Sequence, residues 1–304
     1  MATPSAELAR TVGDVVAGRA RADEPLARHT SFRIGGPADV LVTPDTADEL
    51  AAVVRTAAAT SVPLTILGGG SNMLVGDGGI RGIVVKLGRG FRRTTWDGTC
   101  VEAGAAVQIG RLARDAAARG LAGLEYAEGI PGTVGGALFM NAGAYGGEVS
   151  DAVDTVEGVD AGGLVRRLPR AELAFTYRRA ALPPGFLVTA VRFRLRAETP
   201  DAVEARLEEA RARRTASQPH GWANAGSIFK NPPGDFAGRL VETAGLKGTR
   251  VGGARISEAH GNFIVNEGAA RATDVQALMQ EAQRVVWERS GVWLEPEVRL
   301  VGSW

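Results

Sequence analysis

The stretch ILGGGSNML, residues 66–74, joins an apolar strand-like run to three consecutive glycines, a serine and an asparagine. Small residues in succession let several backbone N–H groups converge on one anion, and two polar side chains add further donors. We therefore predict that this turn cradles a phosphate or pyrophosphate, with a flexible hairpin turn as the alternative. The cradle would consist of Gly68, Gly69, Gly70, Ser71 and Asn72.

A second glycine-rich stretch, EGIPGTVGGALFMNAGAYGGE, covers residues 128–148. Glycine at this density indicates backbone with positive φ or backbone that another group approaches closely. Close packing of a helix on a sheet is the alternative explanation. Two such turns suit an extended ligand lying between two subdomains.

Two common phosphate-binding motifs are absent from the sequence. A P-loop needs Gly-Lys-Ser/Thr after its spaced glycines, and this chain has none. The dinucleotide fingerprint needs glycines at i, i+2 and i+5, but the three Gly-x-Gly pairs at 68, 76 and 88 are followed at the last position by Met73, Arg81 and Arg93. A bound nucleotide would therefore not be held in the Rossmann manner.

Composition excludes several classes of protein. The chain of 304 residues has 35 Lys and Arg against 34 Asp and Glu, which gives no electrostatic case for binding nucleic acid. The single cysteine, Cys100, forms no internal disulfide, and three scattered histidines leave little material for a zinc site. No apolar run approaches the ~20 residues of a membrane span, and the first residues lack a signal-peptide core. We expect a cytoplasmic protein that binds no metal.

The order of elements favours the α+β class over a regular βαβ series. Strands are expected at 38–44, 82–87 and 292–302, residues 63–72 are expected to be a strand that runs into the glycine turn, and helices are expected at 45–60, 107–120, 197–218 and 273–290. Thr273 with Gln276 would form the capping box of the last helix. Because composition shifts to a highly charged helix near residue 199, the expected organisation is an N-terminal helical arm at 1–28, a first domain at 29–198 and a second at 199–304.

Five motifs in order resemble the UDP-N-acetylenolpyruvoylglucosamine reductase (MurB) family, over nearly the whole chain. They are TSFRIGGPADVLVTP (30–44), LGGGSNMLVGDGGIRGIVV (67–85), EGIPGTVGGALFMNAGAYG (128–146), AGSIFKNP (225–232) and LEPEVRLVG (294–302). The resemblance implies a two-subdomain FAD-binding domain of the vanillyl-alcohol oxidase and p-cresol methylhydroxylase type, followed by an α+β substrate domain. Because no room exists between Arg178 and Ser227 for the tyrosine-bearing loop of the family's long form, the chain resembles the short form.

The family's reaction uses NADPH to reduce the enolpyruvyl ether of UDP-N-acetylglucosamine to UDP-N-acetylmuramate for peptidoglycan. By this resemblance the two glycine turns would hold the FAD pyrophosphate and flavin. Neither turn contains the His or Cys to which relatives attach flavin covalently, so non-covalent FAD is expected. The second turn's expected cofactor residues are Gly129, Ile130, Thr133, Gly135, Gly136, Gly143 and Ala144.

Ser227 lies in AGSIFKNP, and from the residues alone it could be a hydrolase nucleophile, a proton donor or a hydroxyl that caps a turn. No G-x-S-x-G elbow surrounds it. His220 and His260 could be folded anywhere, so a catalytic triad stays open at this point. The resemblance favours the proton donor.

Reducing a vinyl ether conjugated to a carboxylate builds negative charge on the carbon next to that carboxylate, which cationic or hydrogen-bonding groups must stabilise. By resemblance, Arg178 pairs with the substrate carboxylate, Glu297 polarises the enolate or assists its protonation, and Ser227 delivers the proton. Arg214, Lys230 and Asn231 are further candidates, for the substrate's phosphates and carboxylate.

Two other functions stay open: an oxidase of the same flavoprotein superfamily acting on a sugar alcohol, and a nucleotide-binding module without catalytic activity. We expect a monomer whose partners are a sugar nucleotide and NADPH, not a nucleic acid or a membrane.

Overall fold

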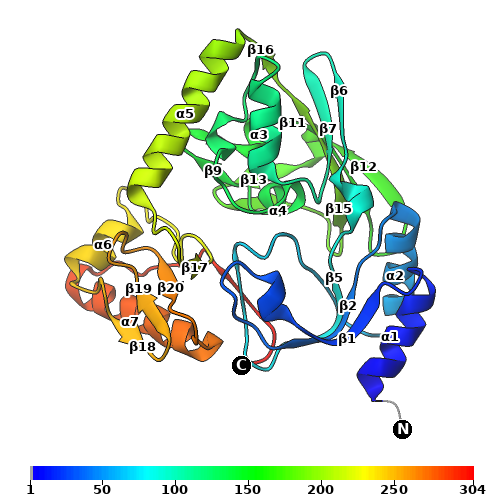
Figure 1. Ribbon diagram of the computed structural model, residues 1–304, viewed down its shortest axis with the longest axis horizontal. Coiled ribbons are helices and arrows are strands. Elements are labelled where there is room, and N and C mark those ends of the chain that lie inside the picture. Colours follow the sequence, from blue (N-terminus) through cyan, green and yellow to red (C-terminus); the bar gives the residue numbers. More distant parts are fainter. Residues whose placement is uncertain (1–2) are drawn as a thin grey trace. The chain divides into compact units, whose positions relative to one another are not determined.

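The computed structural model describes residues 3–304, which form two compact units (Figure 1). The chain crosses from one unit to the other at five points. Three of them lie within strands, one lies between Gly69 and Gly70, and one follows Arg214. Residues 3–22, 40–69 and 82–214 belong to the first unit, and residues 23–39, 70–81 and 215–304 belong to the second.

Helices and strands alternate irregularly along the chain. The α-helices are α1 (Pro4–Asp14), α2 (Ala47–Ala59), α3 (Ile109–Ala117), α4 (Val134–Phe139), α5 (Pro200–Ser217), α6 (Ala237–Thr243) and α7 (Ala272–Ser290). The 3-10 helices are η1 (Leu26–His29), η2 (Arg89–Arg92), η3 (Glu125–Ala127), η4 (Val149–Asp151) and η5 (Arg170–Glu172).

A five-stranded antiparallel sheet, of order β12-β11-β15-β7-β6, is the main sheet of the first unit. Its strands are β6 (Thr94–Asp97), β7 (Cys100–Gly104), β11 (Val153–Val159), β12 (Val165–Pro169) and β15 (Leu187–Arg194). Short pairs add to this unit: β8 (Leu121–Ala122) with β16 (Arg196–Ala197), β9 (Gly143–Ala144) with β10 (Gly147–Glu148), and β13 (Ala174–Thr176) with β14 (Arg179–Ala181). Apolar side chains of the sheet, α3 and α4 form one continuous core.

The second unit has a four-stranded sheet of order β17-β20-β19-β18 and a parallel pair, β21-β4. A further sheet, of order β1-β2-β5-β3, contains the three strands within which the chain passes between units. The strands of these sheets are β1 (Ala20–Pro25), β2 (Pro37–Val42), β3 (Leu64–Ile66), β4 (Met73–Val75), β5 (Ile80–Val85), β17 (Ala223–Asn224), β18 (Arg250–Val251), β19 (Ala254–Ile256), β20 (Ile264–Asn266) and β21 (Arg299–Val301). Apolar faces of α6 and α7 pack with β19 and β20 into this unit's core.

The local sequence explains where α2 begins and which face of it is buried. Thr46 is its N-cap, and the Thr46 hydroxyl accepts the Glu49 N–H at 3.2 Å. Leu50, Val53 and Val54 recur at helical spacing and are buried in the core of the first unit. The helix therefore presents one apolar face, and the predicted helix at 45–60 is confirmed.

The predicted cap of α7 is wrong. Thr273 lies inside the helix, and the N-cap is Arg271, whose N–H donates to the Asp274 carboxylate at 2.9 Å. Asp77, almost two hundred residues away in sequence, accepts the Ala272 N–H at 2.8 Å and the Thr273 hydroxyl at 2.9 Å. A distant carboxylate thus satisfies the free N–H groups that local capping was expected to satisfy.

Two other predicted elements are shorter in the structure. The helix expected across residues 1–28 ends at Asp14, and β1 follows at Ala20–Pro25. The strand expected at 292–302 is reduced to β21. Pro296 has no N–H, and the next two N–H groups, of Glu297 and Val298, both donate to the Ile228 carbonyl, so a regular strand ladder cannot form there.

Candidate functional site

The two glycine turns touch within the first unit. A Cβ added to Gly69 would lie 2.7 Å from the Cα of Gly132, a distance too short for real side chains. A Cβ at Gly68 would lie 3.2 Å from the hydroxyl oxygen of Thr133, and Gly136 is the next neighbour. Two segments some sixty residues apart in sequence therefore approach backbone to backbone, which a residue with a Cβ at position 69 would not allow.

The second turn is fastened to the strand-to-helix connection before α3. The Val134 N–H donates to the Val107 carbonyl at 2.8 Å, and the Gly135 N–H donates to the Ala105 carbonyl at 3.0 Å. The Gly132 carbonyl accepts the Ile109 N–H at 3.2 Å. Thr133, which is buried, is the N-cap of α4. The predicted residues Gly68, Gly69, Thr133, Gly135 and Gly136 are thus brought together.

The hairpin β9–β10 carries the last two predicted cofactor residues. Ala144 pairs with Gly147 across it, which leaves Tyr145 and Gly146 as a two-residue loop with φ of 53° and 87°. Positive φ at both loop positions is the type I′ geometry that suits the twist of paired strands. Gly143 lies so close to Gly147 that a Cβ there would meet its carbonyl oxygen at 2.7 Å.

The start of the second turn lies against α5. Gly129 has φ of 70°, and a Cβ on it would meet the Arg214 side chain at 2.6 Å. Arg214 Nε donates to the Glu128 carbonyl at 3.1 Å, and its guanidinium lies 5.8 Å from the centre of the Tyr145 ring. Burial lowers the pKa of Arg214, with Tyr145 and Glu128 opposing that shift. The structure thus places Arg214 over the entry to the glycine turn.

Arg178 occupies a strained turn in the first unit. Thr176 pairs with Arg179, so Tyr177 and Arg178 form the two-residue loop of the β13–β14 hairpin. Arg178 has φ of 59°, a left-handed conformation that costs a non-glycine residue ~1–2 kcal/mol. Its guanidinium stacks on the Tyr177 ring at 4.9 Å. Buried Asn141 anchors the hairpin by donating to the Thr176 carbonyl at 3.2 Å.

In the second unit, the Ser227 segment runs antiparallel to the Glu297 segment. The Glu297 N–H donates to the Ile228 carbonyl at 2.8 Å, and Phe229 bridges to Pro296. Ser227 and Glu297 are both half-buried. The structure thus brings the segments of these two predicted catalytic residues together although seventy positions separate them.

Asn262 fixes the serine segment from the other side. The Ile228 N–H donates to the Asn262 carbonyl at 2.9 Å. The Asn262 side-chain amide accepts the Phe229 N–H at 2.9 Å and donates to the Phe229 carbonyl at 2.8 Å. Sequence reasoning missed this buried asparagine, because nothing in its neighbourhood indicates a partner more than thirty residues earlier.

The rest of the first glycine turn belongs to the second unit. Gly70 has φ of 63°, and a Cβ on it would meet the His29 carbonyl at 2.2 Å. The Asn72 side-chain amide donates to the Glu297 carbonyl at 3.1 Å, and the Asn72 carbonyl accepts the Arg299 N–H at 3.0 Å. Ser71 is the residue between them and is half-buried. A predicted cofactor residue, Asn72, therefore contacts a predicted catalytic residue directly.

Lys230 and Asn231 follow the serine segment. Lys230 is ion-paired with Glu295, and its N–H donates to the Glu295 carbonyl at 2.8 Å. The Asn231 side-chain oxygen accepts the Ala237 N–H at 3.1 Å, at the first residue of α6. Glu295 and Glu297 thus differ in surroundings: the first pairs with a lysine and is exposed, whereas the second borders Asn72 and Ile228.

Both histidines that could have activated Ser227 have other partners. His260 Nδ1 accepts the Asn262 N–H at 3.1 Å, and burial, followed by nearby Lys247, lowers the pKa of the ring. His220 Nε2 lies 2.7 Å from the Thr215 carbonyl. Nothing in the contacts of these two histidines favours the nucleophile interpretation of Ser227.

Two family models match successive parts of the chain. Residues 38–169 match the model of an FAD binding domain, and residues 218–301 match that of the UDP-N-acetylenolpyruvoylglucosamine reductase C-terminal domain. UDP-N-acetylenolpyruvoylglucosamine reductase 2 of Symbiobacterium thermophilum is 48% identical over 94% of this chain and 93% of its own length. The chain belongs to the UDP-N-acetylenolpyruvoylglucosamine reductase family.

Other members of the reductase family agree with this assignment. The reductase of Geobacter metallireducens is 48% identical over 92% of this chain and 93% of its own length. Among solved structures, the crystal structure of the reductase (MurB) from Thermus caldophilus matches with a TM-score of 0.80 and 42% identity, over 91% of this chain and 97% of that one. The predicted fold class, an α+β chain with an FAD-binding domain followed by a MurB C-terminal domain, is confirmed.

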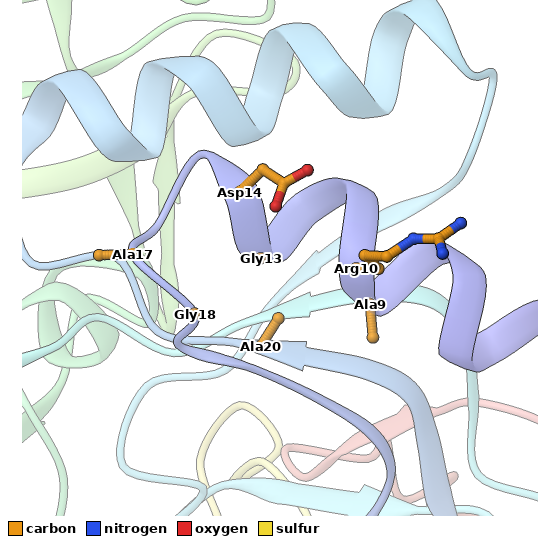
Figure 2. A pocket seen from close by; sticks show the side chains of 7 residues that line it. All are labelled: Ala9, Arg10, Gly13, Asp14, Ala17, Gly18 and Ala20. Atoms are coloured by element: carbon orange, nitrogen blue, oxygen red, sulfur yellow. The ribbon is translucent and has the colours of Figure 1, made fainter.

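A separate pocket of about 490 Å³ lies beside α1 in the first unit (Figure 2). Figure 2 shows Ala17 and Gly18 in the loop after the helix, with Ala20 beside that loop. Small side chains dominate its lining, and none of the predicted site residues contributes to it. It is therefore not the candidate site.

Within residues 3–304, no helix combines the length and the apolar character needed to span a membrane.

Proposed function

We propose that this chain reduces UDP-N-acetylenolpyruvoylglucosamine to UDP-N-acetylmuramate, with NADPH as the hydride donor and FAD as the carrier. Family membership over more than nine-tenths of the chain is the observation that carries the proposal. The FAD binding domain match at 38–169 supports the cofactor. Residues 29–198 would then be the FAD-binding domain and 199–304 the substrate domain. The cytoplasmic location and the monomeric state remain predictions.

The glycine turns fit the cofactor. At Gly69 and Gly132 the backbones are so close that no Cβ fits, which leaves main-chain groups instead of side chains to face a bound pyrophosphate. Gly68, Thr133, Gly135 and Gly136 would complete this part of the FAD site, with Gly129, Ile130, Gly143 and Ala144 at its ends. Gly70, Ser71 and Asn72 would contribute from the other half of the first turn. When bound, FAD would supply the hydride transfer from NADPH to the terminal alkene carbon of the substrate.

Ser227 would supply the proton that completes the reduction. The carbon next to the substrate carboxylate becomes strongly basic as the double bond is consumed, so a neutral hydroxyl is acidic enough to protonate it. The segment carrying Ser227 is held by hydrogen bonds from two sides, through Glu297 and Asn262. These hydrogen bonds hold the backbone next to Ser227 in a defined place, as a group that transfers a proton in a transition state requires.

Arg178 and Glu297 would stabilise the enolate. Arg178 would pair through its planar fork with the substrate carboxylate, into which the developing charge spreads. Its strained turn supports this role, since backbone strain at a non-glycine residue concentrates at functional sites. Glu297, in its protonated form, would polarise the enolate oxygen. Arg214, Lys230 and Asn231 are proposed as ligands of the substrate's phosphates and carboxylate.

An anaerobic titration tests the proposal. The purified protein should be yellow, NADPH should bleach it, and the enolpyruvyl sugar nucleotide should restore the colour while UDP-N-acetylmuramate forms. Rapid reoxidation by air without that substrate would favour the sugar-alcohol oxidase. Protein that stays colourless after incubation with FAD would favour the nucleotide-binding module and overturn the proposed function.

A further inference from the structure

Glu128 is a buried carboxylate that the proposed reaction does not use. Its side chain is only 5% exposed, and it immediately precedes Gly129, where the second glycine turn begins. Arg114 of α3 donates to one of its oxygens at 2.9 Å, and Arg211 of α5 donates to the other at 3.1 Å. Burying a carboxylate is costly unless charged partners satisfy it, and here two guanidinium groups do so.

The same residue also fixes a third arginine. The Glu128 carbonyl accepts Arg214 Nε at 3.1 Å, and the Arg214 side chain lies directly on Gly129, where a Cβ would come within 2.6 Å of it. Arg211 and Arg214 lie three positions apart on α5 and thus on one face of the helix. Glu128 therefore links α3, α5 and the glycine turn at one point.

We propose that Glu128 is a positioning residue for the FAD site: by clamping α5 to the start of the glycine turn, it holds Gly129 in its left-handed conformation and Arg214 above it. This inference rests on the proposed function, because it assumes that the turn binds FAD. The charge of the carboxylate is essential to the role, because an amide of the same size binds two guanidinium groups much less tightly. Loss of the carboxylate would release Arg114 and Arg211 and so loosen the attachment of α5, which carries Arg214, to the turn.

Glu125 provides a matched control. It lies one turn earlier on η3, its side chain is 14% exposed, and it pairs with Arg206 of α5 at 2.9 Å. Its carboxylate also accepts the Gly123 N–H at 2.7 Å, so it too ties this segment to α5. Glu125 does not contact Gly129 or Arg214 through any hydrogen bond described for residues 3–304. A carboxylate that merely holds α5 in place should behave like Glu125.

The test compares FAD affinity in Glu128→Gln and Glu125→Gln by titrating FAD-free protein and following flavin fluorescence. We expect Glu128→Gln to weaken FAD binding about tenfold, as expected when a charged hydrogen-bonding partner is lost, and Glu125→Gln to change it less than about twofold. The visible absorption band of bound flavin should shift in Glu128→Gln alone, whereas thermal stability should fall similarly in both variants.

Equal FAD affinity in the wild type and Glu128→Gln would overturn the inference, as would equal losses in the two variants. If Glu128→Gln does not fold, Arg211→Gln removes one guanidinium from the clamp, and FAD affinity unchanged in that variant would overturn it as well. Failure of the wild-type protein to bind FAD would instead refute the proposed function on which the inference rests.

Discussion

The glycine turn of the first unit and the serine segment of the second are built in opposite ways. Gly69 meets Gly132 at a distance that excludes a Cβ, so the turn requires a residue without a side chain there. Ser227 instead lies in a segment that hydrogen bonds fix from both sides, through Glu297 and the Asn262 amide. The first construction suits a ligand recognised through backbone, and the second suits a side chain that acts at a defined atom.

The largest expected effect separates two glutamates on the same segment of the second unit. Glu297→Gln should lower turnover of the enolpyruvyl substrate about a thousandfold, a loss typical of a catalytic acid, while NADPH still reduces the flavin. Glu295→Gln should lower it only a few-fold, because Glu295 is exposed and pairs with Lys230. Steady-state rates of both variants check this, and equal losses would show that the assignment to Glu297 is wrong.

The next effect tests the strained turn at Arg178. Arg178→Gly should reduce substrate turnover about a hundredfold, as expected when a charge-stabilising donor is lost. The free energy of unfolding should rise by at most ~1 kcal/mol, because glycine adopts positive φ without steric cost. Ala17→Gly is the control, because Ala17 lies in the loop after α1 with a positive φ of 50° and has no proposed role in the reaction. This variant should relieve strain in the same way and keep full activity.

Urea unfolding and turnover of the two variants are measured together. An Arg178→Gly variant with wild-type turnover would remove Arg178 from the reaction and leave its strain unexplained.

A third prediction concerns the glycine turn itself. Gly69→Ala should weaken FAD binding at least tenfold and lower the free energy of unfolding by ~1–3 kcal/mol, because its methyl group would overlap Gly132. Gly136→Ala places a methyl at ordinary distance, 3.7 Å from the Thr133 hydroxyl, in helix α4. The FAD-free form of this variant should therefore gain ~0.5–1 kcal/mol of stability.

The Gly136→Ala variant sharpens the comparison, because its methyl does not crowd the protein. A loss of FAD affinity there would report directly on how closely the ligand approaches the backbone. If both variants bound FAD as the wild type does, the cofactor would not lie against this turn.

The sequence predicted what local periodicity determines. Apolar spacing was sufficient to predict the helix at 45–60, which is α2, and the glycine turns were recognisable as sites of close backbone approach. Contacts made by distant residues were not predictable. Asp77 caps α7 in place of Thr273, and Asn262 fixes the serine segment; neither residue has a local pattern that indicates its partner. Glu128 was overlooked for the same reason, since its arginine partners lie 14 and 83 residues away on two different helices.

The role of Ser227 as proton donor is the central claim, and one transient-kinetic measurement tests it most directly. Wild-type enzyme and Ser227→Ala are first reduced anaerobically with one equivalent of NADPH and then mixed with UDP-N-acetylenolpyruvoylglucosamine. Both proteins should bleach at similar rates, and only the wild type should recover its flavin absorbance quickly, with recovery in Ser227→Ala slowed about a thousandfold. Recovery of Ser227→Ala at the wild-type rate would contradict the account.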